Sequence, residues 1–312
     1  MKPKLDCHVQ WLVQQKKGYE AKWKRLFSSD PEAATCEAVA RYILAANVDC
    51  VQPADDPGTG GPDFVCFVGK NKFYVEVTCL TVDAVTKATG IQNCQPSGAS
   101  NFSLLTDTIK YECGSKAAQC ANLDAPCLLF LGTFHFWSMS CFERCYLEQC
   151  LTGSTEISWL VNPQTGNAAT APVHSTSLNN SVFVRPDGEK RQIEPARKTI
   201  SGMLIANMAL KEPQVNGLLH PDAARPFDPD LLSRIPFGKL TQEYSKGSFS
   251  VTWVNMPRPP GPFWRAYYAV VFAIKFNWFK LRHGRNAASP EQFKEAQREI
   301  DQMSREEREM RR

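Results

Sequence analysis

Residues 61–80 read GPDFVCFVGKNKFYVEVTCL, and their pattern predicts two neighbouring β-strands that each carry an acid. Valine, phenylalanine and tyrosine recur in DFVCFVG and in KFYVEVTCLTV, as they do in strands that face a core. The residues from Gly69 to Asn71 separate the two runs and predict a hairpin turn. Asp63 begins the first strand and Glu76 lies toward the end of the second, so an antiparallel hairpin would bring them side by side.

The segments around this hairpin predict the fold class. Residues 31–46 follow Asp30, a good N-cap, with a proline and then apolar residues at helical spacing. Residues 102–122 are a second helical segment, and residues 127–134, CLLFLGTF, predict a buried strand. A further short strand is expected at residues 47–51. The order favours an α/β fold in which helices flank a mixed sheet.

Composition shifts predict the organisation of the rest of the chain. The predicted segments are an α/β core at 1–162, an extension at 163–287 with short strands, Pro-rich loops and a basic aromatic helix, and a charged C-terminal helix or tail at 288–312. Residues 163–180 are small and polar and contain proline and glycine, which is typical of a long loop. Just before them we expect a helix over 137–150 and a strand over 158–162.

The two acids of the hairpin indicate a site. Because strand side chains alternate, Glu76 shares a face with Tyr74 and Thr78 and is expected to point away from the apolar layer that holds Val75. A carboxylate among strand formers needs solvent, a cation or a metal. Two close carboxylates favour a divalent ion, and their hard oxygens suit Mg²⁺. Such an ion can activate water and stabilise charge on a phosphate.

These residues resemble the motif of the PD-(D/E)xK nuclease superfamily. Pro62 and Asp63 correspond to its PD half, and the run Glu76-Val77-Thr78 corresponds to its (D/E)xK half. The resemblance covers about residues 31–132. It implies a restriction-endonuclease-like core with a C-terminal extension, Mg²⁺ or Mn²⁺ held by Asp63 and Glu76, and hydrolysis of phosphodiester bonds in DNA or RNA.

The resemblance implies further site residues on the two helices. Glu37, on the helix before the hairpin, is placed like an acid that joins the site in many relatives. We expect Glu37 and Arg41, which are four residues apart, on the surface of that helix. Lys116 and Gln119 look like the Lys and Gln that relatives carry on the second helix. The implied catalytic set is Glu37, Asp63, Glu76, Thr78, Lys116 and Gln119. Spacing alone places Thr108, Glu112, Lys116 and Gln119 on one helical face.

Thr78 departs from the motif, because it stands where the superfamily has its lysine. A hydroxyl cannot supply the positive charge that positions and activates the attacking water. Lys116 is the first candidate to replace it, with Lys110 and Lys72 behind. If no lysine reaches the acids, the alternative is a nuclease-fold module that binds nucleic acid or protein and has lost catalysis.

Other interpretations of these residues stay open. Asp63 follows Gly-Pro and could be a turn residue, and Glu76 could be a solvated strand residue. Cys141, Cys145 and Cys150 could meet a zinc ion, although paired spacing with histidine is missing. Motifs of the forms HExxH and GxSxG are absent, so zinc peptidases and α/β-hydrolases have no anchor in this sequence.

Composition and charge bound the partners and the compartment. The 312 residues are 43% hydrophobic and 22% charged, which is typical of a folded globular protein. No secretory signal or membrane span is expected, so we predict an intracellular protein, cytoplasmic or nuclear, with reduced cysteines. The segment 244–290 has cations and aromatic rings but no acid. It suits a nucleic-acid partner or a helix docked on the core. A homodimer stays open.

Overall fold

The computed structural model describes most of the first 256 residues, which form one compact unit. The described residues are 2–15, 18–55, 61–89, 102–135, 144–158, 173–177, 181–187, 192–209, 213–243 and 248–256. Most of the acid-free segment at 244–290, including its predicted helix, lies outside this part of the chain, and so does the whole charged tail at 288–312.

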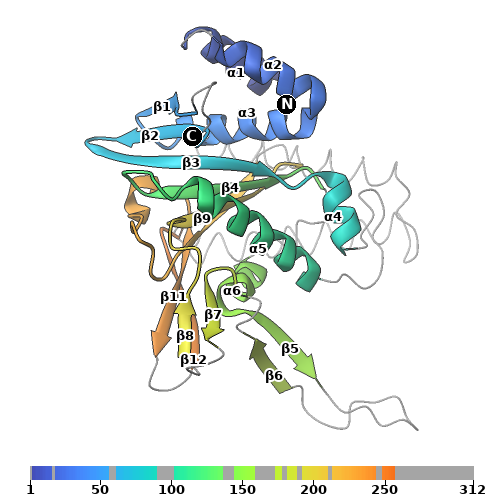
Figure 1. Ribbon diagram of the computed structural model, residues 1–312, viewed down its shortest axis with the longest axis vertical. Coiled ribbons are helices and arrows are strands. Elements are labelled where there is room, and N and C mark those ends of the chain that lie inside the picture. Colours follow the sequence, from blue (N-terminus) through green and yellow to red (C-terminus); the bar gives the residue numbers. More distant parts are fainter. Residues whose placement is uncertain are drawn as a thin grey trace, which may run out of the picture. The chain divides into compact units, whose positions relative to one another are not determined.

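A mixed eight-stranded sheet forms the centre of this unit (Figure 1). In spatial order its strands are β1 (Cys50–Pro53), β2 (Phe64–Val68), β3 (Asn71–Cys79), β4 (Cys127–Thr133), β9 (Gly202–Asn207), β10 (Gln214–Leu219), β11 (Phe237–Glu243) and β12 (Ser248–Val254). Neighbouring strands are parallel at β3–β4, β4–β9 and β10–β11 and antiparallel elsewhere. The prediction of a mixed α/β fold is confirmed.

The predicted hairpin is present, with β2 and β3 joined by a two-residue turn. Val68 pairs with Asn71, and Gly69 adopts a positive φ of 56°, a conformation that glycine reaches without strain. The backbone N–H of Gly69 also donates to Asp49 Oδ2 at 2.7 Å. The register pairs Phe64 with Val75 near the far end of the hairpin. This register places the residue before β2 opposite the residue that follows Val75 on β3.

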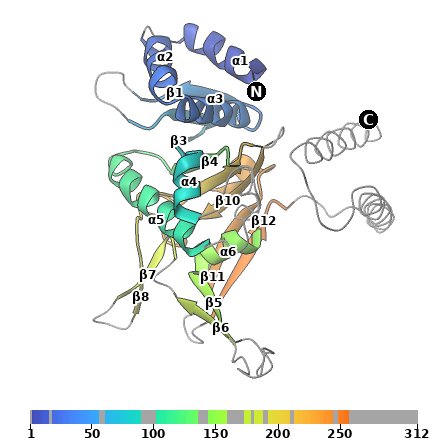
Figure 2. The ribbon, with the colours of Figure 1, turned by 90° about the vertical axis from the view of Figure 1, so that its right-hand side faces the viewer.

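Helices cover both faces of the sheet (Figures 1 and 2). On one face, α3 (Pro31–Ala45) packs through Val39 and Leu44 against β2, β3 and β4. On the other face, α4 (Val82–Thr89), α5 (Phe102–Gln119) and α6 (Arg144–Thr152) pack on the alternate residues of β4. Every residue of β4 is buried, because its two faces both meet apolar layers.

The two long predicted helices are confirmed as α3 and α5. Asp30 caps α3 as expected, since its side chain accepts the N–H of Ala33 at 2.9 Å. Two helices that the sequence did not single out, α1 (Lys2–Val13) and α2 (Tyr19–Ser29), lie on the outer side of α3 (Figure 2). They pack there through Leu12 and Trp23.

The sheet continues across the predicted boundary at residue 162. Strand β9, from the segment predicted as an extension, pairs in parallel with β4 from the predicted core. Residues 1–162 therefore do not complete the sheet by themselves, and the compact unit runs from Met1 to Met256. The sequence missed this continuity because a parallel pair between distant segments has no local signature.

Several smaller elements differ from expectation. Part of the predicted loop at 163–180 is a strand, β6 (Val173–Ser177), which pairs with β5 (Ser154–Ser158) in a separate two-stranded sheet. Of the strand expected at 158–162, only Ser158 is described, and it is the last residue of β5. The helix expected over 137–150 is described from Arg144, as α6. A second small sheet joins β7 (Val184–Asp187) to β8 (Gln192–Pro195), and a 3₁₀ turn, η3, spans Pro229–Leu232.

Two expectations drawn from composition can be compared with the described chain. Its cysteines, with the side chain of Cys145 not described, are free thiols, and most of them are buried. Among the helices described, none is both long enough and apolar enough to span a bilayer.

Gly202 lies on β9, where strands from the predicted core and the predicted extension meet. A substitution at this residue tests the packing there. A Cβ there would lie 2.6 Å from the carbonyl oxygen of Leu218 on β10, which is fixed in the sheet. We expect Gly202→Ala to lower the free energy of unfolding by about 2 kcal/mol.

Gly114→Ala on α5 is the matched control for the same chemical change. Its Cβ would meet only the flexible side chain of Arg197, at 3.4 Å. Helix propensity should then stabilise the variant by roughly 0.5–1 kcal/mol. Urea unfolding of the two variants measures the difference, and equal stability would contradict the close packing at Gly202.

Candidate functional site

Asp63 and Glu76 face each other across the β2–β3 hairpin. Asp63 precedes β2, and its Oδ2 accepts the backbone N–H of Val77 at 2.7 Å, so the carboxylate extends the pairing of the two strands. Burial raises the pKa of Asp63 well above its usual range, and the negative charges of Glu76 and Glu37 raise it further. The three acids are therefore close enough to repel one another. Because its carboxylate binds the backbone of β3, Asp63 is not only a turn residue, as the alternative interpretation had it.

Glu76 is buried beneath α5 and paired with a lysine. Its residue is only 4% exposed, and Lys116 Nζ donates to its Oε1 at 2.6 Å. Glu76 thus lies, as expected, on the face opposite Val75, but that face is buried as well, because α5 covers it. The alternative of a solvated strand residue is wrong for the same reason. Burial raises the pKa of Glu76, although the bond from Lys116 opposes this.

Lys116 and Gln119 form a pair on α5, as the spacing predicts. Lys116 Nζ lies 3.3 Å from Gln119 Oε1 and donates to it as well as to Glu76. Burial lowers the pKa of Lys116, but the bond to Glu76 and the charges of Glu76 and Asp63 outweigh it, so the pKa is raised. The ammonium group stays protonated at neutral pH. Lys116 can therefore act as a cation in the site, and proton removal from water would fall to another group.

The other two candidate lysines pair elsewhere. Lys72 Nζ bonds Asp124 Oδ2 at 2.7 Å, and Lys110 Nζ lies 3.7 Å from Asp107 on its own helix. Thr78 follows Val77 on β3, and its hydroxyl oxygen is buried with no hydrogen-bond partner in the described chain. Three lysines were candidates to replace the motif lysine that is missing at Thr78. Among them, Lys116 forms an ion pair with an acid of the hairpin, Glu76.

Glu37 joins the acids from α3. Burial raises its pKa to about 7, the charge of Lys22 lowers it, and the charge of Glu76 raises it. Its Oε1 lies 3.9 Å from Nε2 of His8, a fully buried histidine on α1. The predicted surface position of Arg41 is wrong, because Arg41 is buried and donates through Nε to His8 Nδ1 at 3.1 Å.

The contact between Arg41 and His8 fixes the state of the histidine ring. Burial and the charge of Arg41 lower the pKa of His8 to about 3, so the ring is neutral. Since Nδ1 accepts from Arg41, the ring proton is on Nε2, the atom nearest Glu37. His8 is therefore neutral, and its Nε2 is buried without a hydrogen-bond partner among the described residues, 3.9 Å from Glu37 Oε1. The ring lies between those of Trp11 and Trp23.

Two charged residues at the site were missed by sequence reasoning, Lys22 on α2 and Asp55 just after β1. They form an ion pair. With Glu37 and Asp63 they line a cavity of about 180 Å³, together with side chains of α1 and α2 and with Pro53 and Phe64 of the sheet. Asp55 could have been found from the sequence, because it is an acid in the Gly- and Pro-rich segment that leads to Pro62 and Asp63. Nothing local distinguishes Lys22 from the other lysines of α2.

The donor set fits a hard divalent cation. In the described chain, no group of three or more His, Cys, Asp or Glu side chains is already gathered as a metal cage. However, Glu76 Oε2 and Asp55 Oδ1 are buried oxygens without hydrogen-bond partners. Buried carboxylate oxygens that repel one another and lack donors are suited to Mg²⁺ or Mn²⁺. Of the three cysteines considered for zinc, Cys150 lies on α6 and is buried in the core. Cys141 and the side chain of Cys145 lie outside the described residues.

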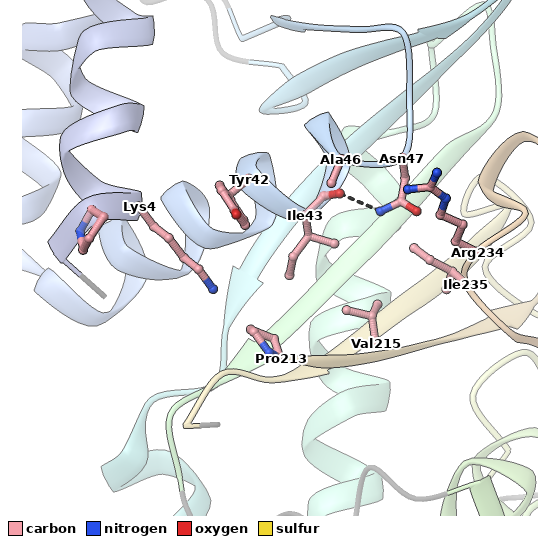
Figure 3. Close-up of a pocket in the computed structure, with 10 residues that line it drawn as sticks. Lys4, Tyr42, Ile43, Ala46, Asn47, Pro213, Val215, Arg234 and Ile235 are labelled. Carbon is pink, nitrogen blue, oxygen red and sulfur yellow. Dashed lines mark hydrogen bonds between the residues drawn. The ribbon is translucent and has the colours of Figure 1, made fainter. Parts of the chain in front are cut away.

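A second cavity, of about 640 Å³, opens beside the C-terminal half of α3 (Figure 3). Lys4, Tyr42 and Arg234 are among its lining residues, and Asn47 Nδ2 donates to the carbonyl oxygen of Ile43 at 2.8 Å. Its described lining contains no carboxylate, histidine, cysteine, serine or threonine. The acid site at Asp63 and Glu76 therefore carries more chemistry than this larger cavity.

The chain matches no known family model, no curated protein and no solved structure. The chemistry of the site accordingly rests on the geometry of its own residues.

The raised pKa values predict how stability changes with pH. An acid whose folded-state pKa is raised favours folding while it is protonated, and this advantage is lost as pH rises through the folded-state pKa. Without divalent cations, we expect the free energy of unfolding to fall between the ordinary glutamate pKa of 4.5 and about 7, the value for Glu37. The share of Glu37 should be on the order of 1–3 kcal/mol.

Glu37→Gln should remove that share of the decrease, because the amide does not ionise. Asp222→Asn is the control, since Asp222 is exposed and its bond to Lys198 lowers its pKa, so it is ionised throughout this range. Urea unfolding in EDTA at several pH values measures both variants. A wild-type stability that stays flat across the range would show that the pKa values of the acids are not raised as described.

Proposed function

We propose that the protein is a Mg²⁺- or Mn²⁺-dependent nuclease of the PD-(D/E)xK type that hydrolyses phosphodiester bonds of DNA or RNA. The observation that carries the proposal is the buried Glu76, set opposite Asp63 across a hairpin and bonded to Lys116 from the next long helix. An acid pair with a lysine is what metal-assisted phosphodiester hydrolysis requires. The order of helix, hairpin, helix and strand agrees with a restriction-endonuclease-like core.

Each residue of the site has a role in this proposal. Asp63 and Glu76 would hold the metal, which when bound lowers the pKa of a water and stabilises charge on the phosphate. Glu37 would support them from α3 in its ionised form, with the neutral ring of His8 nearby. Lys116 would orient the water and stabilise negative charge, and Gln119 would hold the ammonium group in place.

A cation is also what the acids lack. Burial raises the pKa values of Glu37, Asp63 and Glu76, and the negative charge of Glu76 raises those of Glu37 and Asp63 further. A bound divalent ion would favour the ionised forms and so return the pKa values toward their ordinary range. The same ion would restore the stability that the protein loses as pH rises.

The alternative is a module that keeps the nuclease fold and binds nucleic acid without cutting it. Thr78 favours this alternative, because the motif lysine is missing from β3. The position of Lys116 favours catalysis, because it brings an ammonium group to Glu76 from α5. The nucleic-acid partner, the homodimer and the intracellular location stay predictions.

Substitution of the two hairpin acids tests the proposal. Wild type with Mg²⁺ or Mn²⁺ is expected to cleave at least one substrate in a mixture of single- and double-stranded DNA and RNA. Asp63→Ala and Glu76→Ala should each lower the cleavage rate by about 100-fold or more, because each removes a metal ligand. Lys116→Met should lower the rate strongly while leaving the metal ligands in place.

Asp124→Asn is the matched control, since this exposed acid bonds Lys72 and Tyr74 away from the site. It should cleave at the wild-type rate, and EDTA should stop cleavage by both proteins. Cleavage that persists in Glu76→Ala would contradict the proposal. A wild type that binds nucleic acid and cuts none of the substrates would favour the binding module.

A further inference from the structure

Lys22 reaches the acid site from the face of the sheet opposite Lys116. It projects from α2, outside α3, and forms an ion pair with Asp55. Its charge lowers the pKa of Glu37 and of Glu76, so its ammonium group acts on the whole cluster and not on Asp55 alone. Two lysines therefore approach the acids, one through α5 and one through the N-terminal helices.

Lys116 and Lys22 differ in solvent exposure and in their hydrogen-bond partners. Lys116 is 22% exposed and donates both to Glu76 and to Gln119, so its ammonium group is already occupied within the site. Lys22 is 45% exposed and lines the cavity beside Asp63. A half-exposed ammonium group on a flexible stem can exchange one anionic partner for another at little cost. Of the two lysines at the site, Lys22 is therefore the more accessible to an incoming anion.

The charge balance of the site points to the kind of anion. The four carboxylates of Glu37, Asp55, Asp63 and Glu76 outnumber the two ammonium groups of Lys22 and Lys116. One divalent cation would balance the remaining two negative charges when all four acids are ionised. A phosphodiester then adds one more negative charge, and it needs a cation that is not fixed to a carboxylate deep in the site.

We infer that Lys22 binds a backbone phosphate of the nucleic-acid substrate, and that Asp55 holds its ammonium group at the cavity until the phosphate takes its place. The inference rests on the proposed nuclease function and adds a substrate-binding residue to it. Exchange of partners accounts for the buried Asp55 Oδ1, which has no hydrogen-bond donor among the described residues. Once Lys22 moves to the phosphate, both oxygens of Asp55 face the cavity beside Asp63 and can contribute to cation binding.

The test compares oligonucleotide binding by wild type, Lys22→Met and Lys24→Met in the full chain. Lys24 is the matched control, because it lies two residues along α2, is 61% exposed and pairs only with Glu20 among the described residues. The probe is a fluorescent single strand of about twelve nucleotides, as DNA and as RNA, in Ca²⁺. Fluorescence anisotropy at several salt concentrations gives the affinity and its salt dependence.

Loss of one phosphate contact has two expected signatures. Lys22→Met should bind the probe roughly tenfold more weakly. The slope of log affinity against log salt concentration should fall by about one, which a merely structural role would not produce. Lys22→Arg should restore most of the affinity and the slope, and Lys24→Met should match wild type. Equal binding and slope in wild type and Lys22→Met would overturn the inference.

A Mn²⁺ titration separates failure of this inference from failure of the proposed function. Lys22→Met should bind Mn²⁺ at least as tightly as wild type, because it loses a positive charge beside the acids. A wild type that binds Mn²⁺ and the probe, with Lys22→Met binding the probe equally, would remove the role of Lys22 alone. A wild type that binds neither Mn²⁺ nor the probe would remove the nuclease proposal and this inference with it. Circular dichroism shows whether each variant is folded, and Lys22→Gln replaces Lys22→Met if the latter is not.

Discussion

The ion pair between Glu76 and Lys116 is the interaction on which the site depends. Burying a carboxylate in the middle of a sheet costs several kcal/mol of desolvation, and a paired ammonium group offsets this only with good geometry. Here the geometry is good, since one 2.6 Å bond joins the two charges and Gln119 holds the lysine from the same helix. Two apolar residues of similar volume would fill this space at lower cost. The pair therefore contributes less to stability than apolar packing would, and the proposed function gives it a role in chemistry.

The hairpin register carries the rest of the arrangement. Asp63 is fixed by a bond to the backbone of β3, so its carboxylate is positioned by strand pairing and not by the conformation of the loop before it. A shift of one residue in the register would move Glu76 to the α3 face and break its contact with Lys116. The two-residue turn at Gly69 prevents such a shift, because its length sets which residues pair.

The sequence predicted the parts of the site that depend on local spacing. Alternation along β3 placed Glu76 on the face that α5 covers, and helical spacing placed Lys116 and Gln119 together. It did not predict that this face is buried, since the cover comes from a helix distant in sequence. The burial of Arg41 against His8 and the approach of Lys22 to Asp55 were missed for the same reason. Both depend on how α1 and α2 dock on α3, and the continuation of the sheet through β9 likewise depends on contacts between distant segments.

The N-terminal helices connect stability to function at this site. They bring the neutral His8 close to Glu37 and the charged Lys22 to Asp55, so one docking event places a neutral ring and a cation at the site. Without a metal, Lys22 and Lys116 only partly offset the burial of the acids and the repulsion among them, as the raised pKa values of Glu37 and Asp63 indicate. A site that was fully neutralised by its own lysines would have little affinity for a divalent ion. The residual negative charge therefore lowers the stability of the free protein and is also what would give a cation its affinity.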